Sequence, residues 1–354
     1  MHFKEAKTLL SGSGASYGMN IYRGCTHGCV YCDSRSSCYH FTHPFEDVEV
    51  KINAPELLEK ALSSKRRRCM IGTGSMSDPY MHCEEKLGLT RRCLEIILKY
   101  GCGAAIQTKS DRILRDIDLL DKINREAKCV VQMTLTTWDD ELCAKLEPNV
   151  CNTKRRVEVL REMRERGIPT VVWLSPLLPF INDTEENISA ILQACADAGV
   201  NGIICFGMGL TLRDGDREYY YAALDRHFPG LKKKYIERYA NAYELPSPDN
   251  ARLMGLFNSF CEERGIVHTP EECFAWMREL PENIRRSVCS IRASDAKNTR
   301  QSLLPGVYSF SAYSRLKRAL RASESYPRAL QGRAQLSRGQ RGRPMKDGRS
   351  SSGR

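Results

Sequence analysis

The sequence contains no long apolar run. None of its segments approaches the roughly 18–20 apolar residues that are needed to span a bilayer. The first ten residues, MHFKEAKTLL, lack the apolar core and the small-residue cleavage site of a signal peptide. These absences predict a soluble, cytoplasmic protein. Hydrophobic residues nevertheless make up 42% of the 354 residues, which is enough to bury a substantial core.

The chain also carries almost no net charge outside its C-terminal end. The formal charge is +11, but residues 315–354 contain twelve Lys or Arg and two Asp or Glu, a surplus of ten that leaves +1 for the other 314 residues. Residues 321–354 are rich in Arg, Gly, Ser and Gln, so we expect a basic disordered tail. Such a tail is a candidate for binding nucleic acid.

A disulfide framework is excluded as well, although the chain has sixteen cysteines. That framework belongs to short secreted chains. Most of these cysteines lie in apolar stretches, such as Cys129 and Cys205, and are expected to be reduced, buried thiols. Only Cys25, Cys29 and Cys32 have the spacing of metal ligands.

What the sequence does contain is a regular alternation of strand and helix patterns. Strands are predicted at 19–22, 69–72, 104–108, 129–135, 170–174 and 202–206, and helices at 55–64, 84–100, 111–126, 154–166 and 184–198. This alternation predicts an α/β fold, a partial (β/α)6 TIM-like barrel over residues 1–228. Function is then expected at the carboxyl ends of the strands.

The alternation fades after Phe228. Helical patterns follow at 231–243, 249–265 and 270–280. We therefore expect a helical C-terminal extension over residues 229–320, between the barrel and the tail.

The cysteine loop, IYRGCTHGCVYCDSRSSC, has the spacing C-x3-C-x2-C. Three thiolates on one short loop can hold three irons of a four-iron cluster and leave the fourth open to a small molecule. Gly24 and Gly28 allow the backbone to turn tightly around such a cluster. The loop follows the first strand, which places it at the functional rim of the barrel.

A zinc site is the competing interpretation of the same loop. Cys38, His27 or His40 would then supply the fourth ligand. Zinc ligands usually come as two separated Cys/His pairs, and the loop lacks that arrangement. The zinc alternative would make the chain a non-enzymatic zinc or nucleic-acid-binding protein.

The loop resembles the signature of the radical S-adenosylmethionine (radical SAM) superfamily, with an aromatic residue, Tyr31, before the last cysteine. The phrases NIYRGCTHGCVYCDSRS and GTGSMSDPY are similar to the spore photoproduct lyase-like branch, and the similarity runs from about Tyr17 to about Arg226. The resemblance implies a [4Fe–4S] cluster and S-adenosyl-L-methionine (SAM) as cofactors. It also implies a lyase-like enzyme whose 5′-deoxyadenosyl radical abstracts hydrogen from an unidentified substrate, and a flavodoxin- or ferredoxin-like electron donor.

The resemblance also places cofactor-binding residues after successive strands. Tyr31 belongs to the cluster loop. Gly74, Ser75 and Ser77 are placed at the methionyl amine, Thr134 and Thr136 at the ribose or carboxylate, and Ser175 and Phe206 near the adenine.

The chain departs from the lyases at one of these positions. Spore photoproduct lyases carry a cysteine that returns hydrogen to the product radical, and this chain has Ser75 in its place. A serine O–H bond is too strong to donate hydrogen readily to a carbon radical. Cys83 is a weak candidate for a substitute catalytic thiol. Lesion repair of nucleic acid is therefore an alternative, and the substrate stays open.

The basic run at residues 65–68 lies before the second strand. That position is on the amino-end face of the barrel, away from the cluster loop. We interpret the run as cations that stabilise a helix C-terminus.

Overall fold

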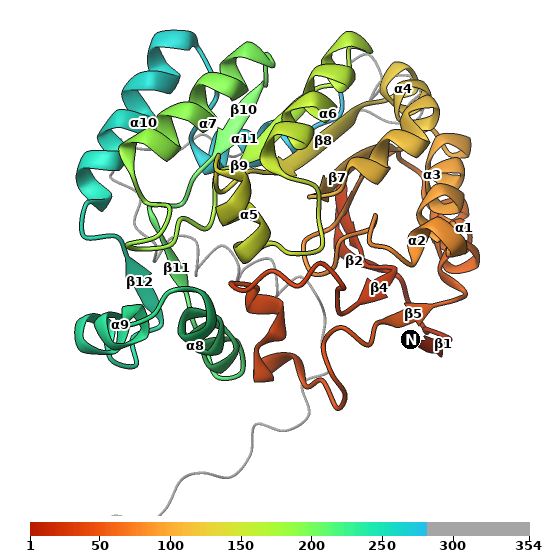
Figure 1. Ribbon diagram of the computed structural model, residues 1–354. Helices are drawn as coiled ribbons and strands as arrows, with labels where there is room; N and C mark the ends of the chain where they lie inside the picture. Colours follow the sequence, from red (N-terminus) through yellow and green to blue (C-terminus); the bar gives the residue numbers. More distant parts are fainter. Residues whose placement is uncertain (282–354) are drawn as a thin grey trace, which may run out of the picture.

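A seven-stranded sheet forms the centre of the molecule. The computed structural model describes residues 1–281 (Figure 1). In spatial order the strands are β10 (Gly202–Ile204), β9 (Thr170–Trp173), β8 (Cys129–Thr134), β7 (Gly103–Thr108), β6 (Met70–Thr73), β3 (Ser16–Met19) and β2 (Leu10–Ser13). The six strands from β10 to β3 pair in parallel, and β2 runs antiparallel to β3 at the edge.

Helices connect the successive parallel strands and arch around the outside of the sheet (Figure 1). They are α1 (Ala54–Ser63), α2 (Glu84–Leu87), α3 (Leu89–Lys99), α4 (Ile117–Glu126), α5 (Asp140–Leu146), α6 (Thr153–Glu165) and α7 (Glu185–Asp197). The predicted α/β architecture, a partial (β/α)6 TIM-like barrel, is confirmed. No helix within residues 1–281 is long and apolar enough to cross a membrane.

The two faces of the sheet have different neighbours. On β7 and β8, the side chains of Ala104, Ile106, Val131 and Met133 join the main core, which also contains the apolar faces of α3, α4 and α6. The alternate residues, such as Gln132, line a cavity on the inner face. This period of two is the pleat of a strand, and it leaves the inner face free for a ligand.

Two small sheets flank the barrel. One joins β1 (His2–Lys4), β5 (Glu49–Lys51) and β4 (Tyr22–Arg23), and the other joins β11 (Gly209–Thr211) and β12 (Glu244–Pro246). Helices α8 (Asp216–His227) and α9 (Leu231–Tyr239) lie beside the second sheet (Figure 1).

The C-terminal part of the described chain packs onto both faces of the sheet. Helix α10 (Asn250–Arg264) packs against α7, and Phe257 and Cys261 belong to the main core. Helix α11 (Pro270–Arg278) packs on the inner face, where Met277 contacts the cluster of Val130 and Ile204. The helices predicted at 249–265 and 270–280 correspond to α10 and α11. The predicted basic tail, residues 321–354, lies outside the described residues, as do residues 282–320 of the predicted helical extension.

Several predicted boundaries differ from the structure. The first barrel strand is Ser16–Met19 rather than 19–22, because these residues pair with β6, and Tyr22 begins a strand of another sheet. The predicted helix at 84–100 is split by Gly88, which has φ +61° and ends α2. The predicted helix at 111–126 begins as a 3-10 helix, η3 (Asp111–Asp116). The predicted helix at 231–243 is shorter, since α9 ends at Tyr239.

The sequence analysis did not identify α5, α8, β11 or β12. Helix α8 buries one face, with Asp216, Tyr220, Ala223 and Leu224, but the apolar pattern of DREYYYAALDRH is obscured because that face includes an acid and Tyr219 and Tyr221 lie outside it. Strands β11 and β12 are three residues each and pair across more than thirty residues of chain, which leaves no local signal.

Candidate active site

The three loop cysteines lie together at one cavity. Cys25, Cys29 and Cys32 are free thiols, and all three line a cavity of about 1150 Å³ on the inner side of the sheet. We call this space the central cavity. Gly24 precedes the loop at φ +86°, and a Cβ on it would lie 2.4 Å from the Phe45 carbonyl oxygen. The turn into the loop therefore requires glycine, as the sequence predicts.

The three thiols need a metal to ionise. Burial raises the pKa of Cys25 to about 12, and it also raises the pKa of Cys29 and Cys32. Buried thiols of this kind stay protonated at neutral pH unless iron or zinc replaces the proton. The donor set of three convergent thiols fits a [4Fe–4S] cluster with one iron left open.

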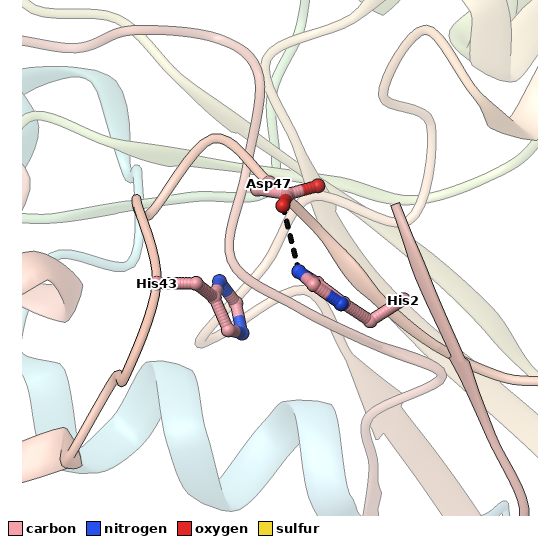
Figure 2. A group of neighbouring side chains, drawn as sticks. All are labelled: His2, His43 and Asp47. Atoms are coloured by element: carbon pink, nitrogen blue, oxygen red, sulfur yellow. Dashed lines mark hydrogen bonds and ion pairs between the residues drawn. The ribbon is translucent and has the colours of Figure 1, made fainter.

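The separation of the sulfurs argues against a single zinc ion. Among the His, Cys, Asp and Glu side chains of residues 1–281, there is one group of three whose ligand atoms all lie within 4.8 Å of one another. This group is His2, His43 and Asp47 (Figure 2). The sulfurs of a tetrahedral zinc site lie only about 3.8 Å apart. The three cysteine sulfurs do not form such a compact group in the described chain, an arrangement in which each can meet a different iron.

The His2, His43 and Asp47 group is separate from the cysteine loop. None of the three residues lines the central cavity. His2 Nε2 is 2.6 Å from an Asp47 carboxylate oxygen (Figure 2). The other oxygen of Asp47 accepts a hydrogen bond from the amino group of Met1. The group is an ion-paired surface contact of the first strand.

The cysteine loop is tied to the second and third parallel strands through Asp78. Its Oδ1 accepts a hydrogen bond from Thr108 Oγ1 at 2.7 Å, and its Oδ2 accepts one from the Lys109 amide at 2.7 Å. His27 Nδ1 lies 3.4 Å from the same Oδ2. Asp78 therefore positions the loop, and these contacts occupy both of its oxygens.

A buried charge network lies behind the loop. Glu147 and Arg156 form an ion pair of 2.5 Å with neither side chain exposed, and the Tyr31 hydroxyl donates to Glu147. Although burial opposes ionisation, the charges of Arg156 and Lys109 hold the pKa of Glu147 below its usual value. Burial also disfavours the charge of Lys109, but Cys29 and Glu147 raise its pKa. A buried ammonium group thus faces the cysteine loop.

Seven of the eight predicted cofactor residues line the central cavity. They are Tyr31, Gly74, Ser75, Ser77, Thr134, Ser175 and Phe206. The Oγ of Ser77 is buried with no hydrogen-bond partner in the described chain, which fits a polar ligand at this place. At Gly74, φ is +99° and a Cβ would lie 1.9 Å from the Gln107 carbonyl oxygen, so the backbone itself forms the wall.

Thr136 is the exception among these residues. It does not line the cavity, and its side chain is fully buried. Its carbonyl oxygen accepts hydrogen bonds from Asn182 and Asn187, which hold the loops after β8 and β9 together. Thr136 thus lies behind the cavity wall, and its Oγ1 is buried with no hydrogen-bond partner in the described chain, so its predicted contact with SAM stays a prediction.

Cys83 is also placed away from the cavity. Its side chain packs at the edge of the main core, and burial raises the pKa of the thiol to about 11. Ser75, in contrast, is an exposed residue of the cavity wall. Cys83, the weak candidate for a catalytic thiol, therefore packs against the main core and does not line the central cavity.

Lys109 and Gln132 are cavity residues that the sequence analysis missed. Lys109 follows β7 directly, at the carboxyl end where function was expected. Gln132 lies inside β8, and its Oε1 accepts a hydrogen bond from the indole of Trp173 at 2.9 Å. A polar residue within an otherwise apolar strand was the signal available for Gln132.

Known proteins are similar to this chain in sequence. Residues 19–191 match the model of the Radical SAM superfamily. An uncharacterised protein of Mycobacterium tuberculosis is 29% identical over 241 residues, 65% of this chain and 69% of the relative. A Radical SAM Nalpha-GlyT isomerase of Pseudomonas phage M6 is 25% identical over 180 residues, 51% of this chain and 36% of the relative.

The fold also matches solved structures. Spore photoproduct lyase complexed with dinucleoside spore photoproduct gives a TM-score of 0.55 at 13% identity, covering 75% of this chain and 80% of that chain. The matched residues and the cavity define the class: residues 19–191 form a radical SAM domain. The protein is a radical SAM enzyme, a class that uses a [4Fe–4S] cluster and SAM as cofactors.

Proposed function

We propose that the enzyme abstracts a hydrogen atom from an organic substrate held in the central cavity. When bound, the cluster and SAM supply the 5′-deoxyadenosyl radical for this step. Cys25, Cys29 and Cys32 hold the cluster, and Ser77 with the Gly74 backbone receives the methionyl end of SAM. The observation that carries the proposal is that three free thiols and seven residues expected to meet cluster or SAM line one cavity.

Other chain residues prepare the site for this chemistry. Tyr31 and Glu147 fix the loop from behind, and Lys109 places a positive charge beside thiols that become anionic on binding iron. Phe206 and Trp173 form an aromatic wall, with ring centroids 5.9 Å apart, suited to a flat ring.

Production of 5′-deoxyadenosine tests the proposal. Protein reconstituted anaerobically with iron and sulfide is mixed with SAM and dithionite, and the nucleoside is measured by mass spectrometry. Cys29→Ala should abolish its formation, whereas Cys38→Ala, which changes an exposed cysteine, should not. One zinc per chain without iron or acid-labile sulfide would instead support the zinc alternative.

A second candidate is the repair or modification of nucleic acid. Its support is that the names of a relative and of solved structures refer to GlyT and to dinucleoside spore photoproduct. Ser75 separates this chain from the lyase chemistry, because it offers no thiol at the cavity wall. Reaction of ultraviolet-irradiated oligonucleotides, followed by nucleoside analysis, tests this candidate.

The reaction also requires a reductant and a compartment that provides one. We expect a flavodoxin- or ferredoxin-like electron donor and a cytoplasmic location. Replacing dithionite with purified flavodoxin and its reductase tests the donor directly.

A further inference from the structure

The central cavity does not end at the cofactor residues. Its lining continues down the inner face to Arg67 and Arg68, which precede β6, and to Arg278 at the end of α11. The basic run was placed by its sequence on the amino-end face, away from the cluster loop. In the structure the basic run lies at that end of the sheet, but two of its arginines, Arg67 and Arg68, line the central cavity.

We propose that these arginines bind a phosphate group of the substrate, remote from the carbon that loses hydrogen. The inference rests on the proposed function for the position of that carbon. The arginine section is defined as Arg67, Arg68 and Arg278. Guanidinium groups hold phosphate oxygens in pairs, so three arginines that line the same cavity favour a phosphate over a neutral group.

The length of the cavity sets the distance between the two ends of the substrate. Arg68 and Gly74 are six residues apart and are joined by β6. Parallel strands rise about 3.3 Å per residue, so the arginine section lies roughly 20 Å from the cofactor residues. The substrate is therefore an elongated molecule, with its phosphate at one end and its reacting carbon near the other.

The section between the two ends is apolar and has small residues on one wall. Met70, Ala105 and Leu280 form a hydrophobic cluster that lines it. At Gly72 a Cβ would meet no atom closer than 3.7 Å, so packing does not require glycine there. Its missing side chain enlarges the cavity and leaves a passage for an apolar part of the substrate.

The positive charge of the arginine section is not fully neutralised by neighbouring acids. Neither Arg67 nor Arg278 forms an ion pair with an acid in the described chain, and Arg278 lies 5.3 Å from the Phe274 ring centroid. Arg68 donates one hydrogen bond to the Glu126 carbonyl at 3.3 Å, which leaves other guanidinium donors. Glu279 is the acid of this wall, so the three arginines give a net positive section.

The experiment measures binding of inorganic pyrophosphate to the metal-loaded, desalted enzyme by calorimetry at low ionic strength. The double variant Arg67→Ala/Arg278→Ala should weaken binding at least about tenfold. The matched control is Arg66→Ala, because Arg66 is the exposed neighbour that does not line the cavity, and it should bind almost as the wild type does. Thermal unfolding confirms that each variant is folded.

Three results would overturn the proposal: no pyrophosphate binding by the wild type, equal losses in the double variant and in Arg66→Ala, or no loss in the double variant. Formation of 5′-deoxyadenosine without substrate should be unchanged in the double variant, so failure of the phosphate site is distinguishable from failure of the proposed function. Displacement of pyrophosphate by oligothymidylate supports the site with a nucleic-acid phosphate, and displacement only by nucleotides supports it with a small-molecule phosphate.

Discussion

The guanidinium of Arg156 and the carboxylate of Glu147 lie 2.5 Å apart, and neither side chain is exposed. Arg156 also donates to the carbonyl oxygens of Cys151 and Thr134, and Glu147 accepts from Tyr31. The pair thus joins the end of β8 to the cysteine loop. Loss of one partner leaves an uncompensated charge in the interior.

We predict that Arg156→Met lowers the free energy of unfolding by about 3–5 kcal/mol, because Glu147 would stay buried without its partner. The control is Arg155→Met, whose partners lie at the surface, with an expected loss of about 1 kcal/mol or less. Urea unfolding measures both. Equal losses would contradict a special role for the buried pair.

Gly74 and Gly72 should respond differently to alanine. Gly74→Ala places a Cβ 1.9 Å from the Gln107 carbonyl oxygen at φ +99°, so we expect a loss of about 2–5 kcal/mol and little SAM binding. Gly72→Ala has its nearest contact at 3.7 Å and should change stability by less than about 1 kcal/mol. Similar unfolding midpoints for the two variants would contradict the backbone-wall role of Gly74.

Cys83→Ala should leave 5′-deoxyadenosine formation unchanged, because Cys83 packs at the core and not in the central cavity. Truncation of a half-buried thiol should cost about 1 kcal/mol of stability. Mass spectrometric product analysis with wild-type and variant enzyme provides the comparison. A large loss of product with intact SAM cleavage would restore Cys83 as a hydrogen donor.

Asp216 predicts a pH dependence of stability. Burial raises its pKa from 3.8 to about 7, with Asp33 adding to the shift and Arg213 opposing it. The native state therefore holds a proton that the unfolded chain releases near pH 4, so this group makes the protein less stable as pH rises from about 4 to about 7.

Asp216→Asn removes that titration. The wild type loses this contribution to stability as pH rises, and the variant does not. The difference in the free energy of unfolding, variant minus wild type, should therefore increase by roughly 1–3 kcal/mol between pH 4 and pH 7 and then level off. Asp214→Asn, which changes the exposed neighbour, is the matched control, and Asp216→Asn should show the larger change with pH. A flat difference for Asp216→Asn would show that Asp216 titrates normally.

Local patterns predicted much of this molecule. The order of β/α units and the cysteine loop follow from periodicity and spacing, which depend on near neighbours in sequence. The family resemblance placed Ser77 and Ser175 after successive strands, and both line the central cavity because parallel strands end at a common rim. Thr136 and Cys83 lie outside the lining of the central cavity, because the direction of a loop depends on partners such as Asn182, which are distant in sequence.

The buried network and the arginine section had no local signal. Arg156 lies on the buried stripe of α6 with Val157, Leu160 and Met163, but nothing local identifies Glu147, nine residues earlier, as its partner. Arg67 was interpreted from its neighbours as a helix-end cation, although the concave sheet brings it to the same cavity as Cys25. Such relationships arise only when the sheet closes around the cavity.

The central claim is that three cysteines hold a cluster whose remaining iron is open to SAM. Electron–nuclear double resonance of the reduced enzyme, with SAM carrying ¹⁵N in its methionyl amine, measures this contact. The account predicts a ¹⁵N hyperfine coupling to the cluster in the wild type and in Cys38→Ala, and none in Cys29→Ala. A cluster signal that SAM leaves unchanged in the wild type would contradict it.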